Sequence, residues 1–137
     1  MKILVMDALG GGIGRQLISL IRKELPEAEV TAVGTNSAAT AAMLKAGAHQ
    51  AATGENAVLV CSRRADVIVG PVGIVIADAM LGEVTPAMAA AVARSCAVRI
   101  LIPFSNCDTV VAGVTETGIG KLVSAAVEEI KKLAGGA

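Results

Sequence analysis

Four glycines within five residues near the amino terminus form the pattern with the clearest chemical use. They stand at positions 10, 11, 12 and 14, with Ile13 between them. An apolar run over residues 2–6 precedes them, and apolar residues at helical spacing follow as far as Pro26. A glycine turn between a strand and a helix lets a phosphate reach backbone N–H groups, because no Cβ holds it away. We therefore expect a nucleotide phosphate to be bound by Gly10, Gly11, Gly12, Ile13 and Gly14.

The turn matches the known dinucleotide fingerprints only in part. Read from Gly10, the G-x-G-x-x-G pattern finds Gly10 and Gly12, but Arg15 stands where the third glycine belongs. The G-x-x-x-G-x-G spacing of short-chain dehydrogenases fits Gly12 and Gly14 and has Ala8 at its first position. The alternative interpretation is a turn that only packs the strand against the helix. Four glycines in five residues exceed what packing requires, which favours phosphate binding.

A second group of small polar residues follows the next predicted strand, residues 29–33. At this place NAD-binding domains carry an Asp or Glu that accepts hydrogen bonds from the adenosine ribose. This chain has Thr35, Asn36 and Ser37 there instead, and no Arg beside them to hold a 2′-phosphate. Contact with a ribose or a 2′-phosphate is one interpretation. The other is local structure, with Ser37 capping the next helix and Asn36 in a turn.

Two further loops are expected at the same edge of the sheet. Gly70, Pro71 and Val72 follow a buried strand at 66–69, where small residues allow a cofactor to approach closely. The loop 103–108 carries further polar groups. Because ligands bind at the carboxyl ends of parallel strands, we expect these loops to lie around one nucleotide, either NAD(P) or another.

Candidates for acid–base or nucleophilic chemistry are few. The chain has no Tyr, which excludes the Tyr-x-x-x-Lys chemistry of short-chain dehydrogenases, and it has no P-loop lysine. His49 is the only histidine, and no ligand spacing predicts a metal site. For each remaining candidate a structural role is favoured, so catalytic residues stay unassigned: Asp7, Asp78, Cys107 and Asp108.

The composition of the chain argues against some classes of binding partner. Twelve basic residues balance twelve acidic ones, and Phe104 is the only aromatic residue, so neither charge nor stacking favours nucleic-acid binding. The most apolar run, 67–77, is too short for a membrane span. Hydrophobic residues make up 54% of the chain, which predicts a homo-oligomer, most simply a dimer.

Localisation is predicted from the cysteines and from the start of the chain. An odd count of three cysteines without a C-x-x-C pair indicates free thiols in a reducing cytoplasm. The sequence opens on a predicted strand and shows no targeting segment. We therefore expect a cytoplasmic protein.

Apolar runs alternate with capped helical segments along the whole chain. This order predicts one α/β domain over residues 1–137, a three-layer Rossmann-like fold with helices on both faces of a mainly parallel sheet of five or six strands. The strands are expected at 2–6, 29–33, 48–52, 66–69, 98–102 and 109–114. Helices are expected at 13–25, 37–46, 57–64, 74–81 and 87–95, and after Gly120, where Leu122, Ala126, Ile130 and Leu133 would form one apolar stripe.

Four strings of the sequence resemble a known family. They are Gly-Gly-Gly-Ile-Gly at 10–14, Ala-Val-Gly-Thr-Asn-Ser at 32–37, Ala-Thr-Gly-Glu-Asn-Ala at 52–57 and Gly-Glu-Val-Thr-Pro-Ala-Met at 82–88. The family is domain of unknown function 3842, a group of uncharacterised small bacterial proteins. It opens its first turn with Asp-Gly-Gln, where this chain has Asp7-Ala8-Leu9. The resemblance implies a bacterial cytoplasmic protein and supplies no activity.

Two functions therefore fit the sequence. The first is a nucleotide-binding module that holds its ligand at the glycine turn. The second is a non-enzymatic regulatory or scaffold subunit that assembles through an apolar helix face. A bound nucleotide would distinguish them.

Overall fold

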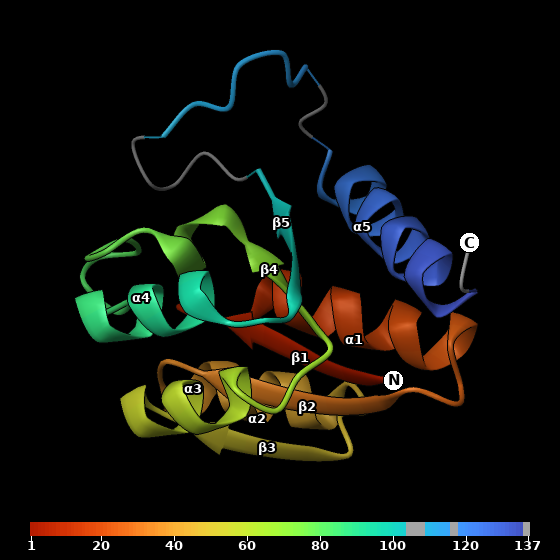
Figure 1. Ribbon diagram of the computed structural model, residues 1–137, viewed down its shortest axis with the longest axis horizontal. Helices are drawn as coiled ribbons and strands as arrows, with labels where there is room; N and C mark the ends of the chain where they lie inside the picture. Colours follow the sequence, from red (N-terminus) through yellow and green to blue (C-terminus); the bar gives the residue numbers. More distant parts are fainter. Residues whose placement is uncertain (104–108, 116–117, 136–137) are drawn as a thin grey trace.

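A single parallel sheet of five strands forms the centre of the molecule. The computed structural model describes residues 1–103, 109–115 and 118–135 (Figure 1). The strands pair in the order β3-β2-β1-β4-β5, each parallel to its neighbour. Their bounds are β1 (Lys2–Asp7), β2 (Glu29–Gly34), β3 (Gln50–Thr53), β4 (Val67–Pro71) and β5 (Val98–Ile102).

Helices cover both faces of this sheet, which gives three layers and confirms the predicted α/β fold. On one face lie α1 (Gly12–Glu24), α2 (Ser37–Lys45) and α5 (Ile119–Ala134), and Figure 1 shows α5 beside α1. On the other face lie α3 (Glu55–Ser62), the short 3-10 helix η1 (Val72–Val75) and α4 (Pro86–Arg94). Among the described residues, no helix is both long and apolar enough to cross a bilayer.

Residues 3–6 of strand β1 form an uninterrupted apolar run because both faces of the strand are buried. Ile3 and Val5 point into the core under α1 and α5, whereas Leu4 and Met6 point into the core under α3 and α4. All four are at most 1% exposed. The strand that carries the glycine turn is thus fixed from both sides.

Two helices start where side-chain caps were expected, and one cap differs from its prediction. Thr85 accepts a hydrogen bond from the N–H of Met88, with Pro86 as the first residue of α4, as predicted. The cap of α2 is Asn36, which accepts from the N–H of Ala39, so the assignment of this cap to Ser37 was wrong. Asn36 has extended backbone angles, which point its side chain back at the first turn of the helix.

The helix predicted over 74–81 does not form. After η1 the chain enters a closed loop in which Asp78, Met80 and Leu81 have φ values of 65°, 55° and 60°. These left-handed conformations are incompatible with a right-handed helix. The apolar content of this segment reflects the burial of Ile74, Ala79 and Met80, not a helical stripe.

Three smaller predictions also fail. No strand occurs over 109–115, where a last strand was expected, and the described sheet has five strands, within the predicted five or six. Strand β5, predicted to be buried, is the last strand of the sheet, and its Val98 is 48% exposed. The predicted stripe of α5 included Leu133, which is 39% exposed. The buried residues of this helix are Val123, Ala126, Val127 and Ile130.

Candidate functional site

The glycine turn lies where the connections of the sheet change direction. The helix after β1 packs on one face, and η1 and α4 after β4 pack on the other, although β1 and β4 are neighbours. Ligands of open α/β sheets bind at such a switch point, beside the carboxyl ends of the strands. A cavity of about 240 Å³ opens there. It is lined by Asp7, Ala8, Leu9, Gly10, Gly12, Ile13, Gln16, Pro71, Met80 and Ile119.

Two glycines of the turn have no structural reason to be glycine. A Cβ added to Gly10 or Gly12 would meet no atom within 4 Å, and neither residue has left-handed φ. Both residues line the cavity and are exposed. No hydrogen bond between the described residues uses the N–H of Gly10, and Gly12 is the first residue of α1, where an N–H has no partner within the helix.

Packing, in contrast, accounts for three other glycines that the sequence associated with a ligand. Gly11 has a φ of 73°, and its Cβ would lie 3.0 Å from the backbone of Ala39. A Cβ on Gly14 would lie 2.5 Å from the sulfur of Met43. A Cβ on Gly70 would collide with the carbonyl oxygen of Met6 on the neighbouring strand. These positions fit α2 against the turn, α1 against α2, and β4 against β1.

Asp7 ends β1 and joins the strand to the start of α1. Its side chain is 4% exposed; Oδ1 accepts from the N–H of Ala8 at 2.8 Å, and Oδ2 accepts from the N–H of Gly14 at 2.7 Å. Burial raises the pKa of Asp7 above its ordinary value, and hydrogen bonds from Gly14, Ala8 and Ile13 offset only part of that increase. Asp7 therefore accepts the N–H groups of Ala8 and Gly14, whereas no acceptor among the described residues takes those of Gly10 and Gly12.

Glu83, which the sequence did not predict to be important, bonds to the turns after β1 and β2. Its Oε1 accepts from the N–H of Leu9 at 2.8 Å, from Thr35 Oγ1 at 2.6 Å and from Asn36 Nδ2 at 2.7 Å. Partial burial raises the pKa of Glu83, but the three donors outweigh it and hold the pKa below its ordinary value. The first two βα turns are thus joined through one carboxylate. In the sequence Glu83 stood out only as part of the family-like string at 82–88, and its partners lie at least 47 positions away.

The remaining predicted residues divide into those near the cavity and those elsewhere. Ile13 and Pro71 line the cavity, and Val72 follows Pro71 as the first residue of η1. Ser37 is exposed at the start of α2, and Asp78 is exposed on the loop after η1. Cys107 and Asp108 lie outside the described residues, as do Ser105 and Asn106.

In the part of the chain that the structure describes, no side-chain cluster has the composition of a metal site, and His49 bonds to a backbone N–H. No group of three or more His, Cys, Asp or Glu side chains there could hold an ion. His49 precedes β3, and its Nδ1 accepts from the N–H of Val30 at 3.0 Å. It contributes to the register between β2 and the segment before β3, away from the glycine turn.

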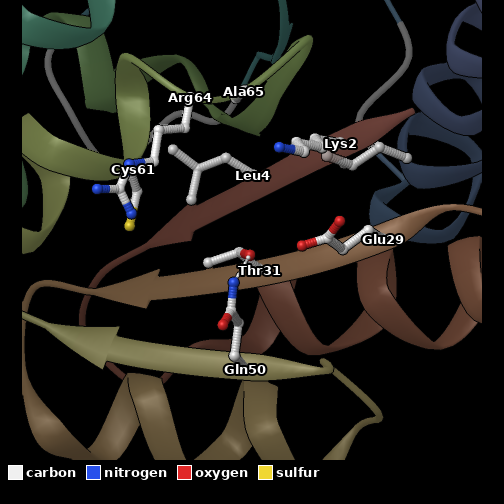
Figure 2. A pocket seen from close by; sticks show the side chains of 9 residues that line it. Lys2, Leu4, Glu29, Thr31, Gln50, Cys61, Arg64 and Ala65 are labelled. Carbon is white, nitrogen blue, oxygen red and sulfur yellow. Dashed lines mark hydrogen bonds between the residues drawn. The ribbon is translucent and has the colours of Figure 1, made fainter.

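A second cavity, of about 150 Å³, lies at the opposite edge of the sheet (Figure 2). Lys2, Glu29 and Gln50, the first residues of β1, β2 and β3, contribute to it. Gln50 Nε2 donates to Thr31 Oγ1 at 2.9 Å, and Figure 2 shows these side chains meeting across neighbouring strands. Because this cavity lies at the amino ends of the strands, the glycine turn does not contribute to it.

Comparisons with known proteins place the chain in a family. In a structural comparison, the chain is similar to the crystal structure of a dodecameric FMN-dependent UbiX-like decarboxylase from Escherichia coli O157:H7. The identity is 14% and the TM-score 0.47, over 96% of this chain and 95% of the other. A comparison with curated protein sequences gave no match. The family model of domain of unknown function DUF3842 matches residues 2–135, so the chain belongs to the DUF3842 family.

Proposed function

We propose that this protein binds a phosphorylated nucleotide at the switch point between β1 and β4, with a phosphate against the N–H groups of Gly10 and Gly12. One observation carries the proposal. Gly10 and Gly12 line a cavity of about 240 Å³, and neither packing nor backbone conformation requires glycine at either position. A ligand that must approach the backbone closely would explain why both positions are glycine.

The neighbouring turn extends this site toward a sugar. Strands β1 and β2 pair in register, with Asp7 opposite Gly34, so Thr35 and Asn36 follow directly beside the glycine turn. Asn36 Nδ2 also donates to the carbonyl oxygen of Leu9 at 2.9 Å. A nucleotide with its phosphate at Gly10 and Gly12 therefore has polar side chains within reach of its ribose. NAD(P) is one candidate ligand, and Ser37, Pro71 and Val72 belong to the same proposed edge.

The proposal covers binding and not a reaction. Asp7 is the only titratable side chain that lines the cavity among the described residues, and its two oxygens already accept backbone N–H groups. A general base must reach a substrate proton, which this buried and occupied carboxylate does not. A role in holding a nucleotide needs no such group.

A ligand panel tests the proposal directly. Native mass spectrometry first detects any ligand that co-purifies with the protein. Thermal melts are then measured with NAD, NADP, FAD, FMN, ATP and CoA, one compound at a time. A nucleotide at one hundred times its dissociation constant is expected to stabilise the fold by about 2.7 kcal/mol. If no compound at millimolar concentration shifts the melt and nothing co-purifies, nucleotide binding is wrong and the scaffold function replaces it.

We also propose that the protein is a homo-oligomer, most simply a dimer. Several apolar side chains are exposed to solvent: Val98 is 48% exposed, Val110 93% and Val114 43%. Val98 lies on β5, the last strand of the sheet, and the other two lie on the segment that leads from β5 to α5 (Figure 1). Contact with a second copy would remove this surface from water.

Light scattering coupled to gel filtration measures the oligomeric state. The expected mass at micromolar protein is at least twice the 13.7 kDa of one chain. Val110→Ser is expected to lower that mass at low protein concentration, whereas Ala38→Ser, on an exposed turn of α2, is a control that should leave it unchanged. A wild-type mass near 13.7 kDa would contradict the dimer.

A further inference from the structure

The loop that follows η1 crosses the carboxyl edge of the sheet and carries Glu83 to the ends of β1 and β2. It closes on itself through the N–H of Asp78, which donates to the carbonyl of Val84 at 2.7 Å, and the N–H of Val84, which donates to the carbonyl of Ala79 at 3.2 Å. Ala79, Met80 and Val84 are buried in the core beneath it. Glu83 is therefore presented from a fixed loop.

This loop keeps a conformation that its residues disfavour. Asp78, Met80 and Leu81 all have φ between 55° and 65°, which costs free energy for residues other than glycine. Leu81 gains no burial in return, since its side chain is 94% exposed. Backbone outliers of this kind gather at ligand sites, where the position of one group matters more than local stability.

The two carboxylate oxygens of Glu83 differ in their surroundings. Oε1 accepts all three hydrogen bonds, from Leu9, Thr35 and Asn36. Within the described ranges, no donor reaches Oε2, and the side chain is half-buried. Glu83 thus offers one oriented, unoccupied acceptor, and its other oxygen is held at the end of β2.

Resting on the nucleotide binding proposed above, we propose that Glu83 recognises the ribose of the ligand and selects an unmodified 2′-hydroxyl over a 2′-phosphate. Strand β2 itself ends in Gly34-Thr35-Asn36 and has no acidic residue. Glu83 supplies that carboxylate from a loop 47 or more positions further along the chain. Its free Oε2 accepts from a hydroxyl donor and repels a phosphate, which has only acceptors at neutral pH.

The test compares two ligand pairs, NAD with NADP and AMP with 2′-deoxy-AMP, by isothermal titration of the wild type and Glu83→Gln. Glutamine keeps the length of the side chain and an oxygen for Leu9 and Thr35, but it removes the charge. The wild type is expected to prefer NAD over NADP and AMP over 2′-deoxy-AMP by about tenfold each, the worth of one hydrogen bond to a charged group. Glu83→Gln puts an amide N–H2 donor in place of the free Oε2, so it should lower both ratios, and the preference for NAD over NADP most of all.

A matched control removes a carboxylate elsewhere. Glu24→Gln, at the end of α1 away from the glycine turn, loses an ion pair with Lys131 and should leave both ratios at their wild-type values. The wild-type ratios need no variant, so they test the inference even if Glu83→Gln is unstable.

The outcomes separate this inference from the function on which it rests. If the wild type binds none of the four compounds and no other nucleotide, nucleotide binding and the ribose role are both wrong. If it binds nucleotides with equal affinity for each pair, or if Glu83→Gln leaves the ratios unchanged, the ribose role alone is wrong. A uniform gain in affinity for all four compounds in Glu83→Gln also overturns it, because Glu83 would then only occupy the site.

Discussion

Replacing Gly12 by glutamate is expected to abolish the nucleotide-induced shift in melting temperature without unfolding the protein. Gly12 is the first residue of α1, is exposed, and has room for a Cβ. The fold should accept the change, because an acidic residue in the first turn of a helix is favourable or neutral. The nucleotide should no longer bind, because the new side chain and its negative charge occupy the place of the phosphate.

The expected magnitudes make the result easy to measure. A nucleotide at one hundred times its dissociation constant stabilises the wild type by about 2.7 kcal/mol, or roughly 10 °C for a chain of this size. A hundredfold loss of affinity in Gly12→Glu reduces that stabilisation to about 0.4 kcal/mol. The melting temperature without ligand should stay within about 2 °C of the wild type.

Ala87→Glu is the matched control for this experiment. It places the same side chain in the first turn of another helix, α4, at an exposed position outside the cavity. It should keep the full ligand shift. If Gly12→Glu shows the same ligand-induced shift as the wild type, the nucleotide binds elsewhere. If both variants lose the shift, the added negative charge weakens binding regardless of where it is placed.

Helices and strands that are determined by residues close together in the sequence could be predicted. Lys2–Met6 is apolar at every position but one because the strand is buried on both faces, and the stripe from Ile13 to Ile21 has helical spacing because one side of α1 meets the sheet. Thr85 and Pro86 mark a helix start by side-chain chemistry alone. Each of these signals lies within a few residues of the structure that it determines.

The parts that failed depend on contacts between distant residues. The segment from Ile74 to Leu81 is apolar, which favoured a helix, but closure between Asp78 and Val84 imposes left-handed residues that no local pattern announces. Glu83 belongs to a family-like string in the sequence, but its contacts with Leu9 and Thr35 are visible only in space. The sequence marked all four glycines of the first turn as candidates, and only the structure separates Gly10 and Gly12 from those that packing explains.

Asp7→Ala is expected to destabilise the fold by about 2–4 kcal/mol. The change leaves the N–H groups of Ala8 and Gly14 without the carboxylate oxygens that now accept them at 2.8 and 2.7 Å. Each unsatisfied donor in a buried place costs about 1–3 kcal/mol, and water reaches this side chain poorly, since it is 4% exposed. Urea unfolding at fixed pH measures the loss. Glu27→Ala, at an exposed turn, should change stability by less than about 0.5 kcal/mol.

The pH dependence of that loss identifies the group responsible. Burial raises the pKa of Asp7 in the folded state above its ordinary value of 3.8, so between those two values the folded protein holds more protons than the unfolded chain. The stability that Asp7 contributes is therefore full below pH 3.8 and decreases as the pH rises through the folded pKa. The difference between wild type and Asp7→Ala should be larger near pH 4 than at pH 7. A difference that grows with pH would mean that hydrogen bonds from Gly14 and Ala8 outweigh burial and hold the pKa of Asp7 below its ordinary value.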